Sequence, residues 1–230
     1  MDISKIKVFY DGTSIAKYSL NPLVCGFTMN STFIKQSGFP SYKEFNDVNS
    51  SYINNRPISY QVTTDSTILS DARDLSSLGS NVYVKVPVIN TKGEYNLSEI
   101  KTLLSENVKV NVTCIFTEQQ VNECYKELSD VNTPFVLSIF AGGISDTGAD
   151  PSGLVKHCVD TFANNKNAEV LWAGVKDNLA VMRAVSLGCH IITIPDTVMD
   201  RIGRIGLDIY QMSIDKVKLF NTDATGIRTL

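Results

Sequence analysis

The chain has 230 residues, of which 43% are hydrophobic and 20% charged, so it is long enough to form one large core. A formal net charge of −3, without a dense Lys/Arg cluster, argues against a nucleic-acid partner. No stretch approaches the roughly 20 apolar residues of a membrane span, and the amino terminus does not read as a secretory signal. These features favour a cytoplasmic protein that acts on a small molecule.

The cysteine and histidine content argues against two kinds of site. Five cysteines occur at wide spacings without a CxxC pair, which indicates free thiols in a reducing compartment and no disulfide framework. The sequence has only two histidines, His157 and His190, so a metal site is not expected. No cofactor is expected either.

Short runs of β-branched and aromatic residues alternate with longer amphipathic segments. Nearly all these runs are continuously apolar, as in strands of a parallel sheet covered on both faces. Eight strands in a chain of this length favour a single-domain (β/α)8 barrel over residues 1–230. A doubly wound open sheet is the alternative, although no GxGxxG turn follows the first strand. The expected strands are residues 7–10, 23–28, 58–62, 82–86, 108–113, 134–140, 169–174 and 190–194.

Five segments between the strands have helical periodicity, and three of them have expected N-caps at Asp65, Thr117 and Asp177. Residues 38–56 are expected to form a polar loop with one short helix. A helix is expected at 205–219, and the tail at 220–230 has no periodicity. We expect this extension, about residues 205–230, to pack on the barrel mouth or on a neighbouring subunit. The five helical segments are 65–78, 96–106, 117–128, 151–164 and 177–187.

Polar residues stand at the carboxyl ends of most expected strands, where the active site of such a barrel lies. Simpler structural roles are possible for some of them. Asp11 and Asn30 could each cap a helix, and Thr113 fits a strand by propensity alone. The set comprises Asp11, Thr28, Asn30, Gln61, Lys85, Asn111, Thr113, Ser138, Gly174 and Lys176.

The stretch NVYVKVPVIN at residues 81–90 places Lys85 in an apolar strand without an adjacent acid. A fully buried lysine is rare unless it has a partner or a chemical role. Burial lowers the pKa of an amine, so a neutral fraction can condense with a carbonyl to give an imine. The imine stabilises the carbanion formed when the neighbouring carbon–carbon bond breaks. Asp11 would move the proton of the departing hydroxyl, and a water held by Gln61 and Thr113 would relay protons.

The order of seven segments along the chain resembles that in the short transaldolases and the related fructose-6-phosphate aldolases. The similarity extends from about residue 6 to residue 200 and includes a lysine on the fourth strand. The segments are FYDGTS, GFTMNSTFI, SYQV, VYVKVPV, VNVTCIFT, SIFAGGISD and VLWAGVKDN.

The resemblance implies a class I aldolase mechanism with Lys85 as the Schiff-base lysine and Asp11 as the acid/base. It implies that Asn30 and Asn111 hold hydroxyls of a three-carbon ketose fragment, that Ser138 meets its terminal hydroxyl, and that Thr113 holds the catalytic water. The enzyme would transfer a dihydroxyacetone unit from a ketose donor to an aldehyde acceptor. Members of the small branch of the family are pentamers or decamers, so a homo-oligomer is expected.

The sequence departs from the family pattern at two places. Gln61 replaces the glutamate of transaldolases, whereas Phe140 and Ser138 follow the transaldolases and not the aldolases. Transfer is therefore favoured over release. At the phosphate end, the family's arginine aligns with Gly143, and its S-x-R motif aligns with Gly174 and Lys176. We expect the substrate to end in another anion, such as a sulfonate, or in an uncharged sugar.

Arg201 and Arg204 follow the eighth strand, and a replacement for the missing charge is one interpretation of them, but a solvated helix face is the favoured one. Two alternatives to transfer remain at this point. One is an aldolase that releases free dihydroxyacetone, and the other is a barrel that binds a sugar without turning it over.

Overall fold

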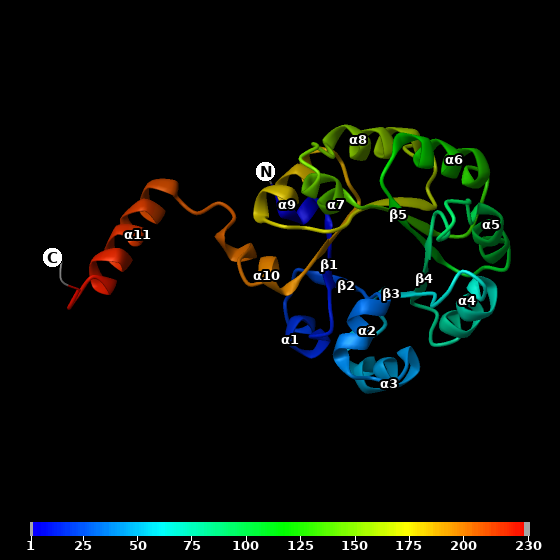
Figure 1. Ribbon diagram of the computed structural model, residues 1–230, viewed down its shortest axis with the longest axis horizontal. Helices are drawn as coiled ribbons and strands as arrows, with labels where there is room; N and C mark the ends of the chain where they lie inside the picture. The colour runs from blue at the N-terminus through cyan, green and yellow to red at the C-terminus, as the bar shows by residue number, and fades with distance from the viewer. Residues whose placement is uncertain (1, 228–230) are drawn as a thin grey trace.

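A computed structural model describes residues 2–227, and its eight parallel strands close into a barrel (Figure 1). Each strand pairs with the next in chain order, and β1 pairs with β8. The closed ring confirms the predicted (β/α)8 barrel and excludes the open sheet. The strands are β1 (Lys7–Asp11), β2 (Val24–Thr28), β3 (Ile58–Gln61), β4 (Val82–Pro87), β5 (Val110–Ile115), β6 (Phe135–Ile139), β7 (Ala168–Trp172) and β8 (Ile191–Ile194).

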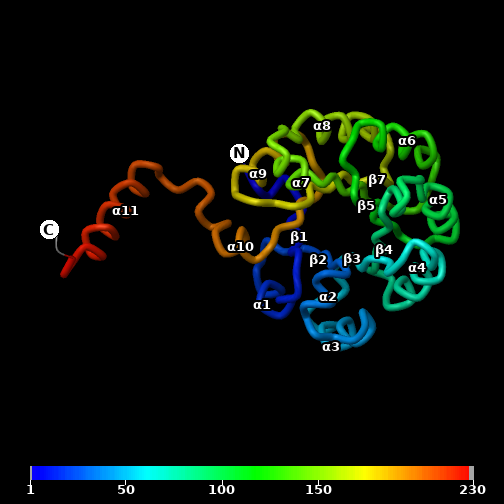
Figure 2. The backbone as a smooth tube through the Cα atoms, in the orientation of Figure 1, coloured from blue at the N-terminus to red at the C-terminus, as the bar shows by residue number. Residues whose placement is uncertain are grey.

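Helices surround the barrel, as the backbone trace in Figure 2 shows. All five helices expected between strands are present, with ends shifted by a few residues. They are α4 (Ile68–Ser76), α5 (Leu97–Ser105), α6 (Glu118–Leu128), α8 (Ser152–Thr161) and α9 (Asn178–Ser186). Shorter elements are η1 (Ile3–Lys5), α1 (Ile15–Ser19) and α7 (Ala141–Asp146). None of the helices within residues 2–227 combines the length and apolar character needed to cross a membrane.

Alternate residues of each strand face two different environments. Val8 and Tyr10 pack beneath the helices, whereas Phe9 belongs to a separate apolar cluster with Val136 and residues of β7 and β8. Gly26 on β2 leaves room for the Phe9 ring, because a Cβ there would lie 2.5 Å from ring carbons. Both faces of the sheet are therefore covered, which explains the continuous apolar runs in the sequence.

Two of the three expected N-caps are confirmed. Thr117 forms a capping box with Gln120, and the Asp177 side chain accepts a hydrogen bond from the backbone N–H of Ala180. The prediction for Asp65 was wrong, because α4 begins at Ile68, with Thr67 at its N-cap position. The Asp65 carboxylate instead reaches the loop after β4, where it accepts hydrogen bonds from the backbone N–H and the hydroxyl of one residue, Thr91.

Residues 38–56 were expected to form a polar loop with one short helix; the one helix is present, but at 12 residues it fills most of the segment. Residues 31–53 form two helices, α2 (Ser31–Ser37) and α3 (Tyr42–Ile53). The buried residues of α3 recur at spacings of three and four and give one inward face, Tyr42, Phe45, Asn49 and Ile53. Polar residues between these positions hid the pattern in the sequence.

The carboxyl-terminal segment contains α10 (Asp196–Met199), η2 (Ile202–Arg204) and α11 (Ile209–Asp223). The expected helix is present, but it continues past 219, so the tail is helical up to 223. Figure 1 shows α11 standing apart from the barrel, and none of its residues is buried. It does not pack on the mouth of its own barrel. Residues 228–230 of the tail lie outside the described residues.

Candidate active site

Strand pairing brings most of the predicted site residues to one end of the barrel. Gln61 pairs with Lys85 across β3 and β4, and Lys85 pairs with Asn111 across β4 and β5. Asp11 pairs with Thr28 across β1 and β2. Since paired positions in parallel strands share a face, these side chains all point into the barrel near the carboxyl ends of the strands. Gly174 and Lys176 follow β7 at the same end.

Lys85 is buried, with 7% of its surface exposed. Among the described residues no carboxylate lies within 4.0 Å of its amine, although long side chains with a full charge are almost never buried without a partner. Burial lowers the pKa of Lys85 from its ordinary value, and the negative charge of Asp11 opposes that shift. The site therefore holds an amine that loses its proton more readily than a lysine in water.

Asp11 lies at the end of β1, and its carboxylate accepts a 2.6 Å hydrogen bond from the Thr28 hydroxyl. Burial raises the pKa of Asp11, while the positive charge of Lys85 and the hydrogen bond from Thr28 oppose this rise. Asp11 does not cap a helix, because α1 begins at Ile15 after Ser14. The simpler structural role considered from the sequence is thus wrong for this residue.

Thr193 on β8 extends this network and was missed from the sequence. Its hydroxyl lies 2.5 Å from that of Thr28, and both side chains are buried. The signal was available, because Thr193 is the one polar residue inside the apolar run IITI. The Thr28 hydroxyl holds the Asp11 carboxylate in place, and Thr193 supports Thr28 from β8.

A second network crosses β3, β5 and β6. Ser138 donates a 2.6 Å hydrogen bond to Asn111 Oδ1, and Asn111 Nδ2 donates to the Ser59 hydroxyl at 3.2 Å. All three side chains are buried. Ser59, which lies two residues before Gln61 and therefore on the same face of β3, was not identified from the sequence. The network fixes the orientation of the Asn111 amide.

Thr113 follows Asn111 by two residues and so points to the same side of β5. Its hydroxyl oxygen is buried and has no hydrogen-bond partner within residues 2–227. The next residue, Cys114, has a φ of 60°, and the pairing of β5 with β6 shifts register there. A buried polar atom without a protein partner is the position where a water or a substrate group would be bound.

Asn30 has the capping role that the sequence allowed. Its side-chain oxygen accepts a 2.9 Å hydrogen bond from the backbone N–H of Phe33 at the start of α2. Of its two side-chain polar atoms, the nitrogen is the one that this cap does not use. Asn30 lies two residues after the end of β2, so the cap also fixes the amide beside the barrel mouth.

The end of the site opposite Lys85 is built by the loops after β6 and β7. The loops touch at Gly142 and Gly174, where a Cβ on Gly142 would lie 1.7 Å from the Gly174 carbonyl oxygen. Gly174 has a φ of 74°, which favours glycine. Phe140 packs against Phe116, with ring centroids 5.3 Å apart. Lys176 is exposed and lies 3.1 Å from the Asp146 carboxylate.

Arg201 and Arg204 are exposed, as the favoured interpretation of a solvated face requires. The Arg201 guanidinium donates a hydrogen bond to the backbone carbonyl of Thr197, four residues earlier. Both arginines follow α10, and the backbone carbonyl of Arg201 accepts a 2.8 Å hydrogen bond from the side chain of Asn178 at the start of α9.

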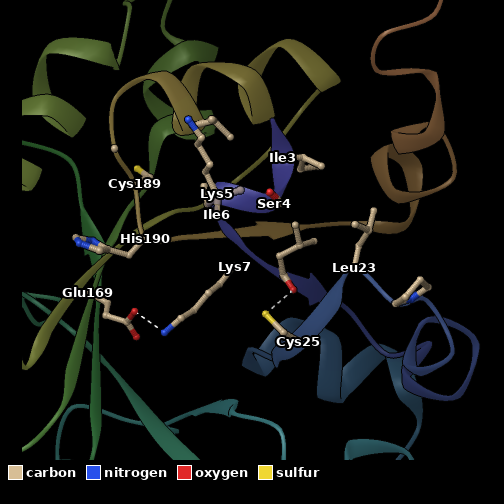
Figure 3. Close-up of a pocket in the computed structure, with 14 residues that line it drawn as sticks. Ile3, Ser4, Lys5, Ile6, Lys7, Leu23, Cys25, Glu169, Cys189 and His190 are labelled. Carbon is tan, nitrogen blue, oxygen red and sulfur yellow. Dashed lines mark hydrogen bonds and ion pairs between the residues drawn. The ribbon is translucent and has the colours of Figure 1, made fainter. Parts of the chain in front are cut away.

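A hollow at the opposite end of the barrel, drawn in Figure 3, lies among the amino ends of the strands. Lys7 donates a 2.6 Å hydrogen bond there to Glu169, so the two charges compensate each other. Burial lowers the pKa of nearby His190. The part of the chain described here contains no group of three or more His, Cys, Asp or Glu side chains arranged to hold a metal ion. The catalytic candidates all lie at the other end.

The unpaired hydroxyl of Thr113 leads to a stability prediction. Thr113→Val replaces it with a methyl group of similar volume, so the free energy of unfolding should stay equal or rise by up to about 1 kcal/mol. Thr193→Val is the matched control, because it removes a hydroxyl that is bonded to Thr28, and it should cost about 1–3 kcal/mol. Urea unfolding of both variants measures the difference. Equal losses would contradict the assignment of Thr113 as unpartnered.

Comparison with known proteins assigns the chain to one family over nearly its whole length. The family model described as transaldolase/fructose-6-phosphate aldolase matches residues 2–227. A probable transaldolase of Nitrosopumilus maritimus is 30% identical over 95% of this chain and 99% of its own. A probable transaldolase of Caldicellulosiruptor saccharolyticus is 28% identical over 92% of this chain and 98% of its own. The chain therefore belongs to the transaldolase/fructose-6-phosphate aldolase family.

Proposed function

We propose that this protein is a transaldolase that forms an imine at Lys85 and moves a dihydroxyacetone unit from a ketose to an aldehyde. The observation that carries the proposal is the burial of the Lys85 amine at the active end of the barrel, with Asp11 as the nearest catalytic acid. Family membership supports an enzyme that acts on sugars. The imine chemistry and the individual roles are inferred from the arrangement of the residues.

In the proposed reaction, the neutral Lys85 amine attacks the C2 carbonyl of the ketose, and loss of water gives an iminium ion. Asp11 takes the proton of the C4 hydroxyl as the C3–C4 bond breaks. The electron pair of that bond flows into the iminium, which leaves an enamine on Lys85 and releases the first aldehyde. The enamine then attacks the acceptor aldehyde, and Asp11 returns its proton to the new hydroxyl. Hydrolysis of the resulting iminium frees the product ketose.

The polar ring around Lys85 supports each step. Thr113, whose hydroxyl is unpaired, would hold the water that is lost and regained at the imine, and Gln61 would orient it from β3. Asn111 and Ser138, fixed by their mutual hydrogen bond, would bind hydroxyls of the three-carbon unit. The remaining side chains assigned to substrate hydroxyls are those of Thr28 and Asn30.

Transfer is favoured over release because the enamine must be protected from protons. Phe140 follows β6 and presents an apolar ring, packed on Phe116, where a tyrosine would offer an acidic hydrogen. An aldolase that releases dihydroxyacetone is therefore the second candidate. A barrel that binds sugar without turnover is disfavoured, because binding alone does not require a buried amine beside a carboxylate.

Trapping of the imine tests the proposal. Incubation with dihydroxyacetone and borohydride should increase the mass of the protein by that of dihydroxyacetone less one oxygen atom, and peptide mapping should locate the adduct at Lys85. Lys85→Met should abolish the adduct, whereas Lys109→Met, which changes a lysine at the amino end of β5, should retain it. An enzyme that gives no adduct with any ketose would not be a Schiff-base transaldolase.

The pH dependence of trapping tests the coupling between Lys85 and Asp11. Imine formation needs the neutral amine, so its rate rises with pH through the lowered pKa of Lys85. Asp11→Asn removes a negative charge that stabilises the ammonium, so the midpoint should move to lower pH. Asp130→Asn, far from the site on the loop before β6, is the charge-matched control and should leave it unchanged. A midpoint that stays fixed or rises in Asp11→Asn would contradict the coupling.

We also propose a cytoplasmic homo-oligomer, pentameric or decameric by resemblance, in which α11 packs on a neighbouring copy. The helix is exposed along its length, with Ile209 83% and Phe220 62% exposed. A helix of 15 residues without tertiary contacts is marginal in water. Since α11 stands away from its own barrel, a second copy of the chain is the proposed partner for its apolar residues (Figure 1). The free state of the five cysteines supports a reducing compartment.

The double variant Ile209→Ser, Phe220→Ser should reduce the mass of the assembly, because it removes apolar area from the proposed contact without touching the barrel. Lys216→Ser on the same helix is the matched control and should leave the mass unchanged. Sedimentation velocity measures both. An assembly that keeps its mass in the double variant would show that α11 does not hold the copies together.

A further inference from the structure

We propose that the part of the substrate farthest from Lys85 is uncharged, so that the enzyme works on unphosphorylated sugars, and that Gly143, Asp146 and Phe116 determine this preference. The inference rests on the proposed function, because it concerns the far end of the same site. It narrows the choice between another anion and a neutral group that the sequence left open.

The first argument is the charge at the loops after β6 and β7. Lys176 is the cation that stands where the family has an arginine, and its amine lies 3.1 Å from Asp146 Oδ2. Asp146 is the last residue of α7 in the loop after β6, next to the loop after β7 that contains Lys176. A phosphate or sulfonate would have to separate this pair and would then face a free carboxylate. The pair therefore disfavours any anion, and not phosphate alone.

The second argument is the position of Gly143, where the family has its other arginine. A Cβ at Gly143 would lie 2.8 Å from the Phe116 ring, so the ring occupies the space directly beside the glycine. Phe116 is 42% exposed, and Phe140 supports it from below the mouth. The surface offered to the substrate is an aromatic face in place of a guanidinium fork. Such a face packs against the C–H groups of a sugar chain and has no charge for an anion.

The third argument is the loop after β8. Barrels of this class often bind phosphate with the loops after strands 7 and 8 and a short extra helix. Here the short helix α10 begins with an acid, Asp196, whose carboxylate accepts hydrogen bonds from the hydroxyls of Tyr10 and Ser14. A carboxylate already occupies the amino end of that helix. Among the charged side chains at the loops after β6, β7 and β8, Asp146 and Asp196 are acids, and Lys176 is a cation that is already paired with Asp146.

Capture of ketoses at Lys85 measures the preference directly. Fructose and fructose 6-phosphate share one carbon skeleton and differ in the terminal phosphate, so borohydride trapping at a series of concentrations gives a half-saturating value for each. Each half-saturating concentration is corrected for the fraction of the sugar that is in the open-chain ketone form. The wild-type protein should capture fructose at a concentration equal to or lower than that for fructose 6-phosphate. Tighter capture of the phosphate ester would overturn the inference.

Two substitutions should reverse the preference. Asp146→Asn frees Lys176, and adding Gly143→Arg installs a guanidinium once the exposed Phe116 ring turns aside. We expect the double variant to lower the half-saturating concentration of fructose 6-phosphate relative to fructose by about tenfold or more. Asp130→Asn is the matched control, since Asp130 also faces a lysine, Lys101 at 3.8 Å, but at the other end of the barrel. It should leave the ratio unchanged.

The same experiment separates this inference from the function on which it rests. One outcome is that the protein forms adducts with dihydroxyacetone and both hexoses but captures the phosphate ester more tightly. That result would support the transaldolase proposal and contradict the inference that the far end of the substrate is uncharged. A double variant whose ratio equals that of the control would show that Gly143 and Asp146 do not set the preference. No adduct with any ketose would remove the proposed function, and this inference with it.

Discussion

The placement of the Lys85 amine inside the closed barrel is the constraint on which the rest of the site depends. Removing an ammonium from water is expensive, so the interior must either pair it or favour its neutral form. The negative charge of Asp11 partly compensates the ammonium, and burial favours the neutral amine. Burial lowers the pKa of Lys85 and raises that of Asp11, whereas the attraction between the two charges opposes both shifts, so burial brings the proton affinities of the two groups closer together. This is the property that reversible carbon–carbon bond cleavage requires.

Two hydrogen-bond networks keep the groups around Lys85 rigid. Thr28 holds Asp11 and is itself bonded to Thr193 on β8, and the hydrogen bonds from Ser138 through Asn111 reach Ser59 on β3. Buried polar groups cost free energy unless they are paired, so these contacts also stabilise the barrel. Thr113 differs from these residues, because its buried hydroxyl has no hydrogen-bond partner among residues 2–227. Most polar side chains around Lys85 are thus fixed by hydrogen bonds, and one buried hydroxyl is left unsatisfied. This combination is typical of a site that binds a water or a substrate group.

The two ends of the proposed substrate meet different chemistry. Near Lys85 the lining is polar and neutral apart from the reacting pair, whereas the far end has the Phe116 and Phe140 rings and a compensated Lys176–Asp146 pair. The close contact of Gly142 with Gly174 brings the loops after β6 and β7 together and leaves no side chain at either position. Substrate preference at that end therefore depends on the few side chains that remain and on their charge balance.

The sequence by itself determined the barrel, since continuous apolar strands alternating with helices have few other ways to cover both faces of a sheet. It also predicted Lys85 and Asp11 as candidates, because an isolated charge in an apolar strand is visible without coordinates. Only the tertiary structure gave the contacts of Ser59 and Thr193, which depend on which neighbours the barrel closure brings within hydrogen-bond distance. It also showed that the one helix expected within residues 38–56 extends over residues 42–53, because burial on one face and not composition decides that segment. The pairing of Lys176 with Asp146 was likewise beyond the sequence, since the two residues lie 30 positions apart on separate loops that only the closed barrel brings together.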